Sequence, residues 1–383
     1  MGAYLLPWRK PECISGPGCL GKIPELLEKC GASHPMIVAS RRQSATEAFQ
    51  TMVSRLPDYC LFSDVPPNPR VSTVEAIAAL YRAEGCDSFI AIGGGSPMDA
   101  AKAAAARLVR PNRTVEQMGG LLKVRRRIPP FVAVPTTAGT GSETTVAAVV
   151  TDDATHHKYA LGDLCLIPRY AVLDPELTVS LPASITAQTG MDALTHAIEA
   201  YVGRWLPTAE TNRLAEEAVV TIFRYLPEAC RCGENLAARE QMLKASYQAG
   251  YAFTRASVGN IHAIAHTLGG LYDVPHGLAN AVLLPVVLED YGEAIAPQMA
   301  RLAELTGVCT QGSQEEKARA FVEAIYDMNR RLGIPDGFDC IRSEDIPRMV
   351  NWAEAEANPA YPVPVIYDKR RFARIIQRVQ RSV

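Results

Sequence analysis

Up to about residue 182, short apolar runs alternate with segments whose apolar residues recur at helical spacing. The apolar runs predict strands at 36–40, 60–63, 89–92, 131–134 and 170–174. The segments between them, bounded by Pro, Gly or polar residues, predict helices at 22–30, 44–56, 71–84 and 97–108. Such alternation is typical of a largely parallel α/β layer. A run at 146–152 predicts one more strand outside the parallel series.

The pattern changes after Leu181-Pro182, where strand-like runs stop and helical spacing continues almost to the C-terminus. We therefore expect an α/β domain over residues 1–182 and an all-helical domain over residues 183–383. The sequence shows neither an internal repeat of 20–50 residues nor a low-complexity linker between the two.

Composition and charge exclude several classes of protein. Hydrophobic residues make up 48% of the chain and charged residues 21%, which is typical of a globular protein. The net charge of -2 provides no large attraction to nucleic acid or an anionic membrane, so we expect neither partner. The most basic run, Lys123–Arg127, is interpreted as a solvated loop.

The cysteine pattern and the N-terminus favour a cytoplasmic protein. The ten cysteines contain no C-x-x-C pair, and we expect them to be reduced. The sequence has neither a recognisable signal peptide nor an apolar stretch of the ~18–20 residues that a membrane span needs.

A glycine turn lies between a predicted strand and a predicted helix, at Gly93–Gly95. Residues without a Cβ let the backbone approach a phosphate, and the helix that follows directs N–H groups at it. Ser96 as N-cap, Pro97 at the first helical position and Asp99 at the third also form a plausible helix start. We expect a phosphate-binding turn, with the alternative that Ser96 and Asp99 serve only the helix. The turn is neither G-x-G-x-x-G nor a Walker A loop.

A second turn, Pro135–Glu143, also follows a strand and carries the hydroxyls of Thr136 and Thr137. Together the two turns are suited to holding the phosphates and sugars of a dinucleotide. The alternative is a Thr/Gly-rich loop that caps a helix.

Four histidines and an aspartate form a candidate metal site in the helical part. Asp192 and His196 lie four residues apart, as do His262 and His266, and His276 follows. Spacing of i, i+4 places both members of a pair on one helix face. Each histidine taken alone is more often a core or surface residue, but the set suits Fe²⁺ or Zn²⁺. The spacing does not tell which three imidazoles coordinate.

Five ordered motifs resemble those of the iron-containing, or group III metal-dependent, alcohol dehydrogenases. They are GGGSPMDAAK (93–102), PTTAGTGSE (135–143), DPEL (174–177), GMDALTHAIEA (190–200) and HAIAHTLGGLYDVPHGLANAVLLP (262–285). The resemblance runs from about residue 16 to about residue 359, which is nearly the whole chain.

The resemblance implies an N-terminal α/β dinucleotide-binding domain and an all-α C-terminal domain, an architecture shared with dehydroquinate synthase. It implies four metal ligands: Asp192, His196, His262 and His276. His266 would be a catalytic, non-ligand histidine beside the substrate and the nicotinamide ribose. The cofactor-binding residues would be Gly93, Gly94, Gly95, Ser96 and Asp99 for the pyrophosphate and nicotinamide end, Thr136, Thr137 and Leu177 for the adenosine side, and Lys158 for the nicotinamide-side ribose.

One departure from the family pattern concerns the choice between NAD and NADP. Where many NAD-using members carry an aspartate after the second strand, this chain has Ser40, followed by Arg41 and Arg42. Guanidinium groups match phosphate geometry, so we hypothesise that NADP(H) is accepted. The alternative is that the two arginines only solvate a helix start.

The implied reaction is reversible hydride transfer between NAD(P)H and a primary alcohol/aldehyde pair, with iron, or else zinc, as Lewis acid and His266 as proton relay. Family members are often dimers or larger, so a homo-oligomer is expected. The alternatives are a reductase of unsaturated keto acids of the maleylacetate reductase kind, a polyol dehydrogenase, a lyase of the dehydroquinate synthase kind, and a catalytically silent binding or shell-associated protein.

Overall fold

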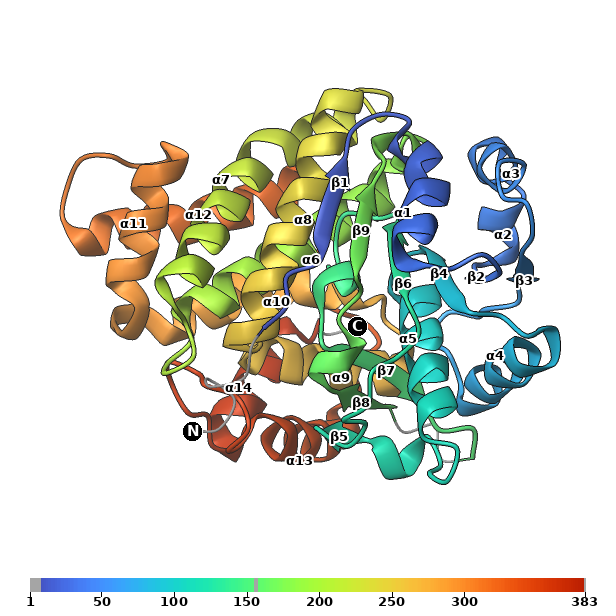
Figure 1. Ribbon diagram of the computed structural model, residues 1–383. Coiled ribbons are helices and arrows are strands. Elements are labelled where there is room, and N and C mark those ends of the chain that lie inside the picture. Colours follow the sequence, from blue (N-terminus) through green and yellow to red (C-terminus); the bar gives the residue numbers. More distant parts are fainter. Residues whose placement is uncertain (1–7, 155–157, 382–383) are drawn as a thin grey trace. The chain divides into compact units, whose positions relative to one another are not determined.

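The computed structural model describes residues 8–154 and 158–381 and divides the chain into two compact units, Met1–Ser180 and Leu181–Val383 (Figure 1). The first unit ends two residues before the boundary expected at residue 182. Each unit is described by itself below.

The first unit is built on a six-stranded parallel sheet. Its strands, in spatial order, are β1 (Glu12–Ser15), β9 (Tyr170–Leu173), β6 (Phe131–Pro135), β4 (Ser88–Gly93), β2 (Pro35–Val38) and β3 (Cys60–Phe62). The five predicted strands are confirmed. β1 was missed because its sequence, ECIS, carries no apolar run, and it lies partly exposed at the sheet edge.

Alternate residues of the central strand β4 explain why helices cover both faces of this sheet. Phe89 and Ala91 pack in one core with helices α4 (Val71–Glu84) and α5 (Gly95–Val109). Ile90 and Ile92 pack in the other core with α1 (Ile23–Cys30) and α3 (Glu47–Val53). A sheet buried on both sides needs the continuous apolar runs that made these strands recognisable.

The strand order reverses between β2 and β4. From β2 the chain passes outward to the edge strand β3 and then returns to the other side of β2 as β4. Ligands of open α/β sheets bind outside the carboxyl ends of strands at such a switch point. The residues that follow β2 and β4, Ser40 and Gly94, therefore lie at the expected end of this sheet.

A small second sheet completes the first unit. It contains β5 (Gly120–Leu121), β8 (Lys158–Gly162) and β7 (Ala147–Thr151), and β7 runs antiparallel to β8. The strand predicted outside the parallel series is thus confirmed. The short helix α2 (Arg41–Ser44) follows β2.

In the described part of the second unit all of the regular elements are helical, as predicted. The α-helices are α6 (Ala183–Val202), α7 (Ala209–Arg231), α8 (Leu236–Ala256), α9 (Asn260–Tyr272), α10 (His276–Tyr291), α11 (Ala296–Thr306), α12 (Gln314–Arg331), α13 (Ile346–Ala357) and α14 (Lys369–Val379). Helix α6 packs against α7, α8 and α10 and is buried along most of its length. Side chains of α6 that would be surface groups on a peripheral helix are therefore held inside the unit.

Candidate metal and cofactor sites

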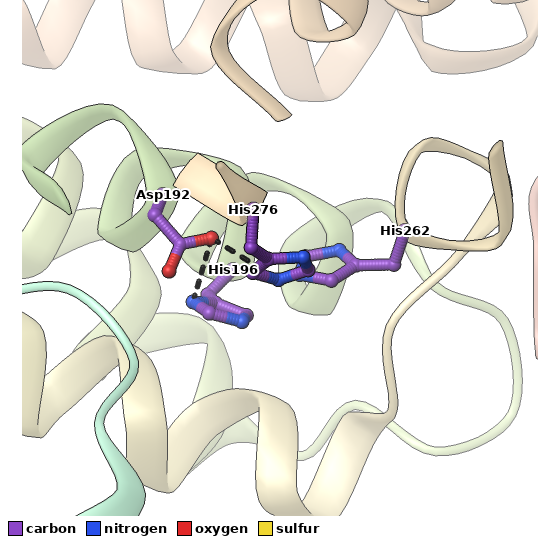
Figure 2. Close-up of side chains that lie close together, drawn as sticks. All are labelled: Asp192, His196, His262 and His276. Atoms are coloured by element: carbon purple, nitrogen blue, oxygen red, sulfur yellow. Dashed lines mark ion pairs between the residues drawn. The ribbon is translucent and has the colours of Figure 1, made fainter. Parts of the chain in front are cut away.

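Four candidate ligands from three helices meet at one point of the second unit (Figure 2). Asp192 and His196 come from α6, His262 from α9 and His276 from α10. One ligand atom from each residue lies within 4.8 Å of all the others. The first three are buried, and His276 is partly exposed. One carboxylate and three imidazoles that converge in this way have the composition of an Fe²⁺ or Zn²⁺ site with room for a further ligand.

Local structure explains this convergence. The i, i+4 spacing on α6 brings Asp192 Oδ1 to 4.0 Å from His196 Nδ1. His276, the first residue of α10, places its Nε2 at 3.6 Å from the same oxygen. The approach of α10 to α6 depends on Gly277, because a Cβ there would lie 2.4 Å from the Gln188 carbonyl oxygen.

A side-chain amide, that of Asn280, lies where the candidate ligands converge. The Asn280 amide nitrogen donates to Asp192 Oδ1 at 2.7 Å and lies 3.1 Å from Nε2 of both His262 and His276. The buried Oδ1 of Asn280 has no hydrogen-bond partner among the described residues. One carboxylate oxygen and two imidazole Nε2 atoms thus face a single neutral amide nitrogen that has only two hydrogens to donate. With Nε2 unprotonated, these oxygen and nitrogen donors fit a divalent ion.

A buried carboxylate that the sequence analysis missed fixes the orientation of His262. Glu199 Oε2 lies 2.5 Å from His262 Nδ1, and Oε1 accepts a hydrogen bond from the Ile261 amide at 2.8 Å. Burial raises the pKa of Glu199 to about 7, against the lowering effect of backbone N–H groups. Burial, followed by the neighbouring histidines, holds the pKa of His262 well below 6.5. His262 is therefore neutral, donates from Nδ1 and keeps the Nε2 lone pair for a metal.

We expect Glu199→Gln to weaken metal binding by about 10–100-fold, because an amide cannot accept hydrogen bonds at both of its terminal atoms. The His262 ring would then lose the group that orients it. Competition with a chelator of known affinity measures the dissociation constant for Fe²⁺ and Zn²⁺. Glu304→Gln, which removes a surface carboxylate paired with Lys317, is the matched control. Unchanged metal affinity in Glu199→Gln would show that the pairing with His262 has no role in metal binding.

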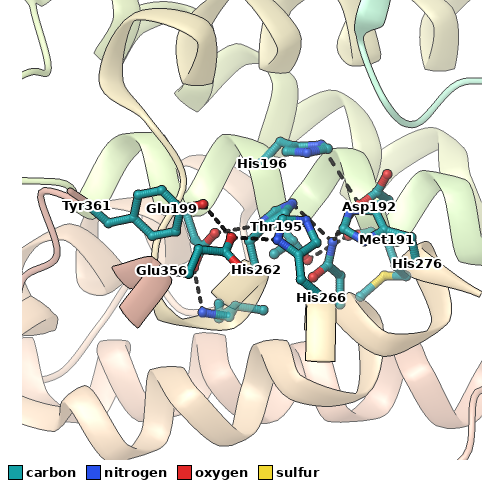
Figure 3. Close-up of polar contacts among 12 residues, drawn as sticks. Met191, Asp192, Thr195, His196, Glu199, His262, His266, His276, Glu356 and Tyr361 are labelled. Atoms are coloured by element: carbon teal, nitrogen blue, oxygen red, sulfur yellow. Dashed lines mark hydrogen bonds and ion pairs between the residues drawn. The ribbon is translucent and has the colours of Figure 1, made fainter. Parts of the chain in front are cut away.

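His266 lies beside the four-residue cluster and outside it (Figure 3). Its ring is 5.2 Å from that of His276, and its Nδ1 lies 2.6 Å from Glu356 Oε1. Glu356 also accepts a hydrogen bond from the Tyr361 hydroxyl at 2.6 Å. Burial alone would raise the pKa of Glu356, but His266 and Tyr361 hold it below its usual value. His266 is thus part of a polar chain of three residues, of which the sequence indicated only the histidine.

In the first unit the two predicted turns lie against one another. The Thr136 amide donates to the Gly93 carbonyl oxygen at 2.9 Å. A Cβ at Gly94 would lie 3.3 Å from Thr137 Oγ1, and one at Gly95 would lie 3.2 Å from Thr140 Cγ2. The glycines are therefore needed for contact between the turns, in addition to any contact with a phosphate.

The predicted cap of helix α5 is wrong. The helix begins at Gly95, with Gly94 as N-cap and no side-chain cap, so Ser96 lies inside the first turn. Ser96 Oγ instead accepts a hydrogen bond from the Asn68 amide at 3.2 Å. Lys158 Nζ donates to Asn68 Oδ1 at 3.0 Å. Two of the predicted cofactor residues, Ser96 and Lys158, are thus linked through an asparagine that the sequence did not indicate.

Asp99 does not take part in capping α5, although the sequence indicated that role. Its Oδ1 accepts a hydrogen bond from Ser142 Oγ at 2.9 Å, and its Oδ2 accepts one from the Val149 amide at 3.1 Å. Burial raises the pKa of Asp99 to about 6, against the lowering effect of Lys102 and of these bonds. Both carboxylate oxygens serve the packing of α5 against the segment from Ser142 to Val149, which leaves Asp99 weakly suited to direct contact with a cofactor.

The environment of Ser40 contains an acid that the sequence analysis did not consider. Ser40 caps α2, where its hydroxyl accepts a hydrogen bond from the Gln43 amide, and it bridges to Asp64 in the backbone. Asp64 lies 2.8 Å from the Arg41 guanidinium. One of the two arginines assigned to a 2′-phosphate is therefore already paired. Leu177 lines a cavity of about 350 Å³ together with residues of α3, the helix that follows α2.

Comparison with known proteins agrees with this pair of sites. The family model described as "Iron-containing alcohol dehydrogenase" matches residues 10–175, and that described as "Fe-containing alcohol dehydrogenase family, C-terminal" matches residues 186–378. The NAD-dependent methanol dehydrogenase of Bacillus methanolicus is 36% identical, over 88% of this chain and 90% of its own. The 1,3-propanediol dehydrogenase of Klebsiella pneumoniae is 35% identical, over 95% of each chain.

A solved structure of a 1,3-propanediol oxidoreductase superposes with a TM-score of 0.93 at 34% identity, covering 98% of this chain and 100% of the other. One family thus matches both halves of the chain, and its members share 34–36% of their residues with this sequence. The chain belongs to the iron-containing alcohol dehydrogenase family.

Proposed function

We propose that this chain is a metal-dependent oxidoreductase that transfers a hydride between a nicotinamide cofactor and a primary alcohol/aldehyde pair. The observation that carries the proposal is the convergence of Asp192, His196, His262 and His276 within 4.8 Å. Family membership supplies the reaction class. The names of relatives that act on methanol and 1,3-propanediol favour small primary alcohols as the substrate class.

The four residues would hold the ion. The family to which the chain belongs indicates iron, and the ligand set also suits zinc. Lewis-acid polarisation of the substrate oxygen is the chemistry that such an ion supplies when bound. Asp192 adds a negative charge to the three neutral rings, which reduces the net charge of the loaded site. Glu199 and Asn280 hold His262 in orientation, and burial of the site excludes bulk water from most of its surface.

His266 is the residue that we propose to carry the alcohol proton. A neutral imidazole can accept a proton at one ring nitrogen while the other donates to a carboxylate. Glu356, at 2.6 Å from Nδ1, stabilises the protonated ring that this transfer would create. The partly exposed position of His266 allows the proton to pass on to solvent.

Removal of the metal tests the proposal directly. Protein stripped with a chelator and shown to be metal-free should lose nearly all nicotinamide-linked oxidation of ethanol, propanol and 1,3-propanediol, and Fe²⁺ or Zn²⁺ should restore it. The measurement is the change in nicotinamide absorbance against metal content. Full activity of the metal-free protein would overturn the assignment. The same substrate panel, extended to polyols and unsaturated keto acids, separates the alternative reductases, and product formation without net use of NAD would favour a lyase.

For the cofactor we propose NAD(H), with NADP(H) accepted to a degree set by Asp64. Because Asp64 pairs with Arg41 and adds a negative charge, Asp64→Asn should raise kcat/KM for NADPH relative to NADH by about 2–5-fold, the effect of one solvent-exposed charge. Steady-state kinetics with both cofactors measures the ratio. Asp58→Asn, a change at another exposed aspartate of the same unit, serves as the control. An unchanged ratio would place the adenosine ribose away from Arg41.

We also propose a cytoplasmic homodimer or larger homo-oligomer, as the cysteine usage and the family resemblance suggest. Among the described residues, no helix combines the length and apolar character that crossing a membrane requires. Analytical ultracentrifugation of the purified protein measures the oligomeric state.

A further inference from the structure

The first unit contains a cavity lined mainly by cations, at the opposite end of helix α5 from the glycine turn. The cavity has a volume of about 650 Å³ and is lined by Arg110, Arg113, Gln117, Leu122, Lys123 and Arg125, which we call the basic pocket. Four of the six lining residues carry a positive charge. The volume is within the range of small-molecule sites.

The charges of the basic pocket are not neutralised within the described part of the chain. No carboxylate there lies within 4.0 Å of a charged nitrogen of the four cations or of the neighbouring Arg126, whereas Arg107, nearby in sequence, pairs with Glu75 at 2.6 Å. Burial, followed by the charges of Arg126 and Arg113, lowers the pKa of Arg110, against a raising effect of Asp163. Like charges are thus held together without an ion-pair partner among the described residues, and a bound anion would stabilise them.

Asp163, a buried carboxylate whose charge acts on Arg110, is engaged by the backbone. Asp163 Oδ2 accepts hydrogen bonds from the amides of Val124 and Arg125 at 3.1 and 2.9 Å. Its Oδ1 accepts one from the Cys165 amide at 3.2 Å. Asp163 therefore shapes the loop that carries the cations and forms no ion pair with them.

Backbone contacts hold the pocket in shape. Arg113 donates to the Lys123 carbonyl oxygen at 2.9 Å, and Arg110 donates to that of Val124. Leu122 and Arg125 have φ values of 55° and 47°, in the left-handed region that side chains other than glycine rarely adopt. Such strain persists where the surroundings impose it, and it concentrates at ligand sites.

The basic pocket is separate from the glycine turn. Helix α5 begins at Gly95, and Arg110 follows its last residue. Fifteen helical residues span about 22 Å at 1.5 Å per residue. The negative end of the helix dipole accounts for the cation of Arg110, but not for the three further cations drawn from residues 113–125.

We propose that the basic pocket binds a small metabolite that carries two or more phosphate groups. Guanidinium groups match phosphate oxygens in bidentate geometry, and the Gln117 amide adds a neutral donor. One phosphate neutralises at most two of the four cations, so a second group is needed to balance the pocket. The lining contains no aromatic residue on which a nucleobase could stack. This proposal replaces the interpretation of Lys123–Arg127 as a solvated loop.

Calorimetric titration of the metal-loaded protein, with NAD⁺ saturating, tests the proposal with fructose 1,6-bisphosphate as probe. We expect saturable binding that weakens with salt. Inorganic phosphate should bind more weakly, and unphosphorylated fructose should not bind. In Lys123→Gln/Arg125→Gln the affinity for the bisphosphate should fall at least ~10-fold through loss of two charge-assisted contacts. Neither side chain forms a hydrogen bond or ion pair within the described part of the chain, where these residues bond only through the backbone. Circular dichroism verifies that the variant folds.

The matched control is Arg319→Gln/Arg331→Gln, which removes the same charge from exposed positions of α12. Its affinity for the bisphosphate should be unchanged. The proposal is overturned if the bisphosphate shows no saturable binding, if both double variants lose affinity equally, or if inorganic phosphate binds as tightly as the bisphosphate. Binding of an acidic peptide in place of the bisphosphate would identify a protein partner and would equally overturn it.

Discussion

His262→Ala is expected to abolish tight metal binding and to lower kcat/KM by about 10³-fold or more, since Lewis-acid stabilisation of the developing oxygen charge is lost. His262 is the ring whose position is most strongly fixed, by Glu199 at Nδ1 and Asn280 at Nε2. Its loss removes one ligand and leaves the Glu199 carboxylate buried without its histidine partner. Metal content by mass spectrometry and nicotinamide-linked kinetics are the two measurements.

His266→Ala separates the roles of neighbouring histidines on the same helix. This variant should keep its metal and lose about 10²–10⁴-fold in kcat, the usual contribution of a positioned acid or base. The pH dependence of kcat should change with it, because Glu356 loses the ring that it faces at 2.6 Å. His34→Ala, at a histidine of the first unit that pairs with Asp58, should leave metal content and rate unchanged.

Two outcomes would contradict the assignment. If His262→Ala retains stoichiometric metal, the four-residue cluster is not the metal site. If His266→Ala loses its metal while His262→Ala does not, the ligand set includes His266. Either result can be told from misfolding, because circular dichroism reports the helical content of the second unit.

The sequence predicted most strands of the first unit and the helical character of the second because local patterns determine them. Five of the six strands of the parallel sheet carry a continuous apolar run, whereas the edge strand β1 does not. The helix containing Asp192 and His196 shows its spacing directly. What the sequence analysis missed depends on contacts between distant residues. Glu199 follows His196 by three residues and resembles any surface acid until α9 is packed over it.

The errors at the cofactor turns have a similar origin. Ser96 precedes a proline in a sequence that resembles a helix cap, but packing of Gly94 and Gly95 against Thr137 and Thr140 shifts the helix start toward the turn. Arg41 appears unpaired in the sequence because its partner Asp64 lies 23 residues later, after another strand. The sequence nevertheless contained a signal for Glu199. It lies seven residues after Asp192 and three after His196, a spacing that places it on the same face of α6.

Lys102 is a buried cation of helix α5 that no part of the sequence analysis singled out. Its Nζ donates to the carbonyl oxygens of Ser142, Thr145 and Ala147 at 2.5, 3.0 and 3.2 Å, and to the Thr145 hydroxyl at 2.9 Å. Burial lowers the pKa of Lys102 to about 8, against the raising effect of Asp99 and a second buried acid. The ammonium group therefore ties α5, just after the glycine turn, to the end of the second turn.

Lys102→Met is expected to lower the free energy of unfolding of the first unit by about 3–5 kcal/mol, because removal of one partner leaves buried charges and carbonyl groups unmatched. The second buried acid is Glu143, whose pKa is raised to about 7 by burial, so both carboxylates would become protonated when the cation is lost. Urea unfolding, followed by fluorescence and by nicotinamide affinity, measures the effect. The control is Lys29→Met, which replaces an exposed lysine of α1 and should change the free energy of unfolding by less than ~0.5 kcal/mol.

The cofactor measurement decides what the lysine does. Because Lys102 holds the two turns together, the variant should lose NAD affinity at urea concentrations where the sheet is still folded. If stability falls and NAD affinity in the folded state is unchanged, Lys102 supports the core alone, and the glycine turn keeps its shape through the contacts of Gly94 and Gly95 with the threonines. If neither changes, the buried ammonium group contributes no net stability, and an apolar side chain of equal length replaces it without loss.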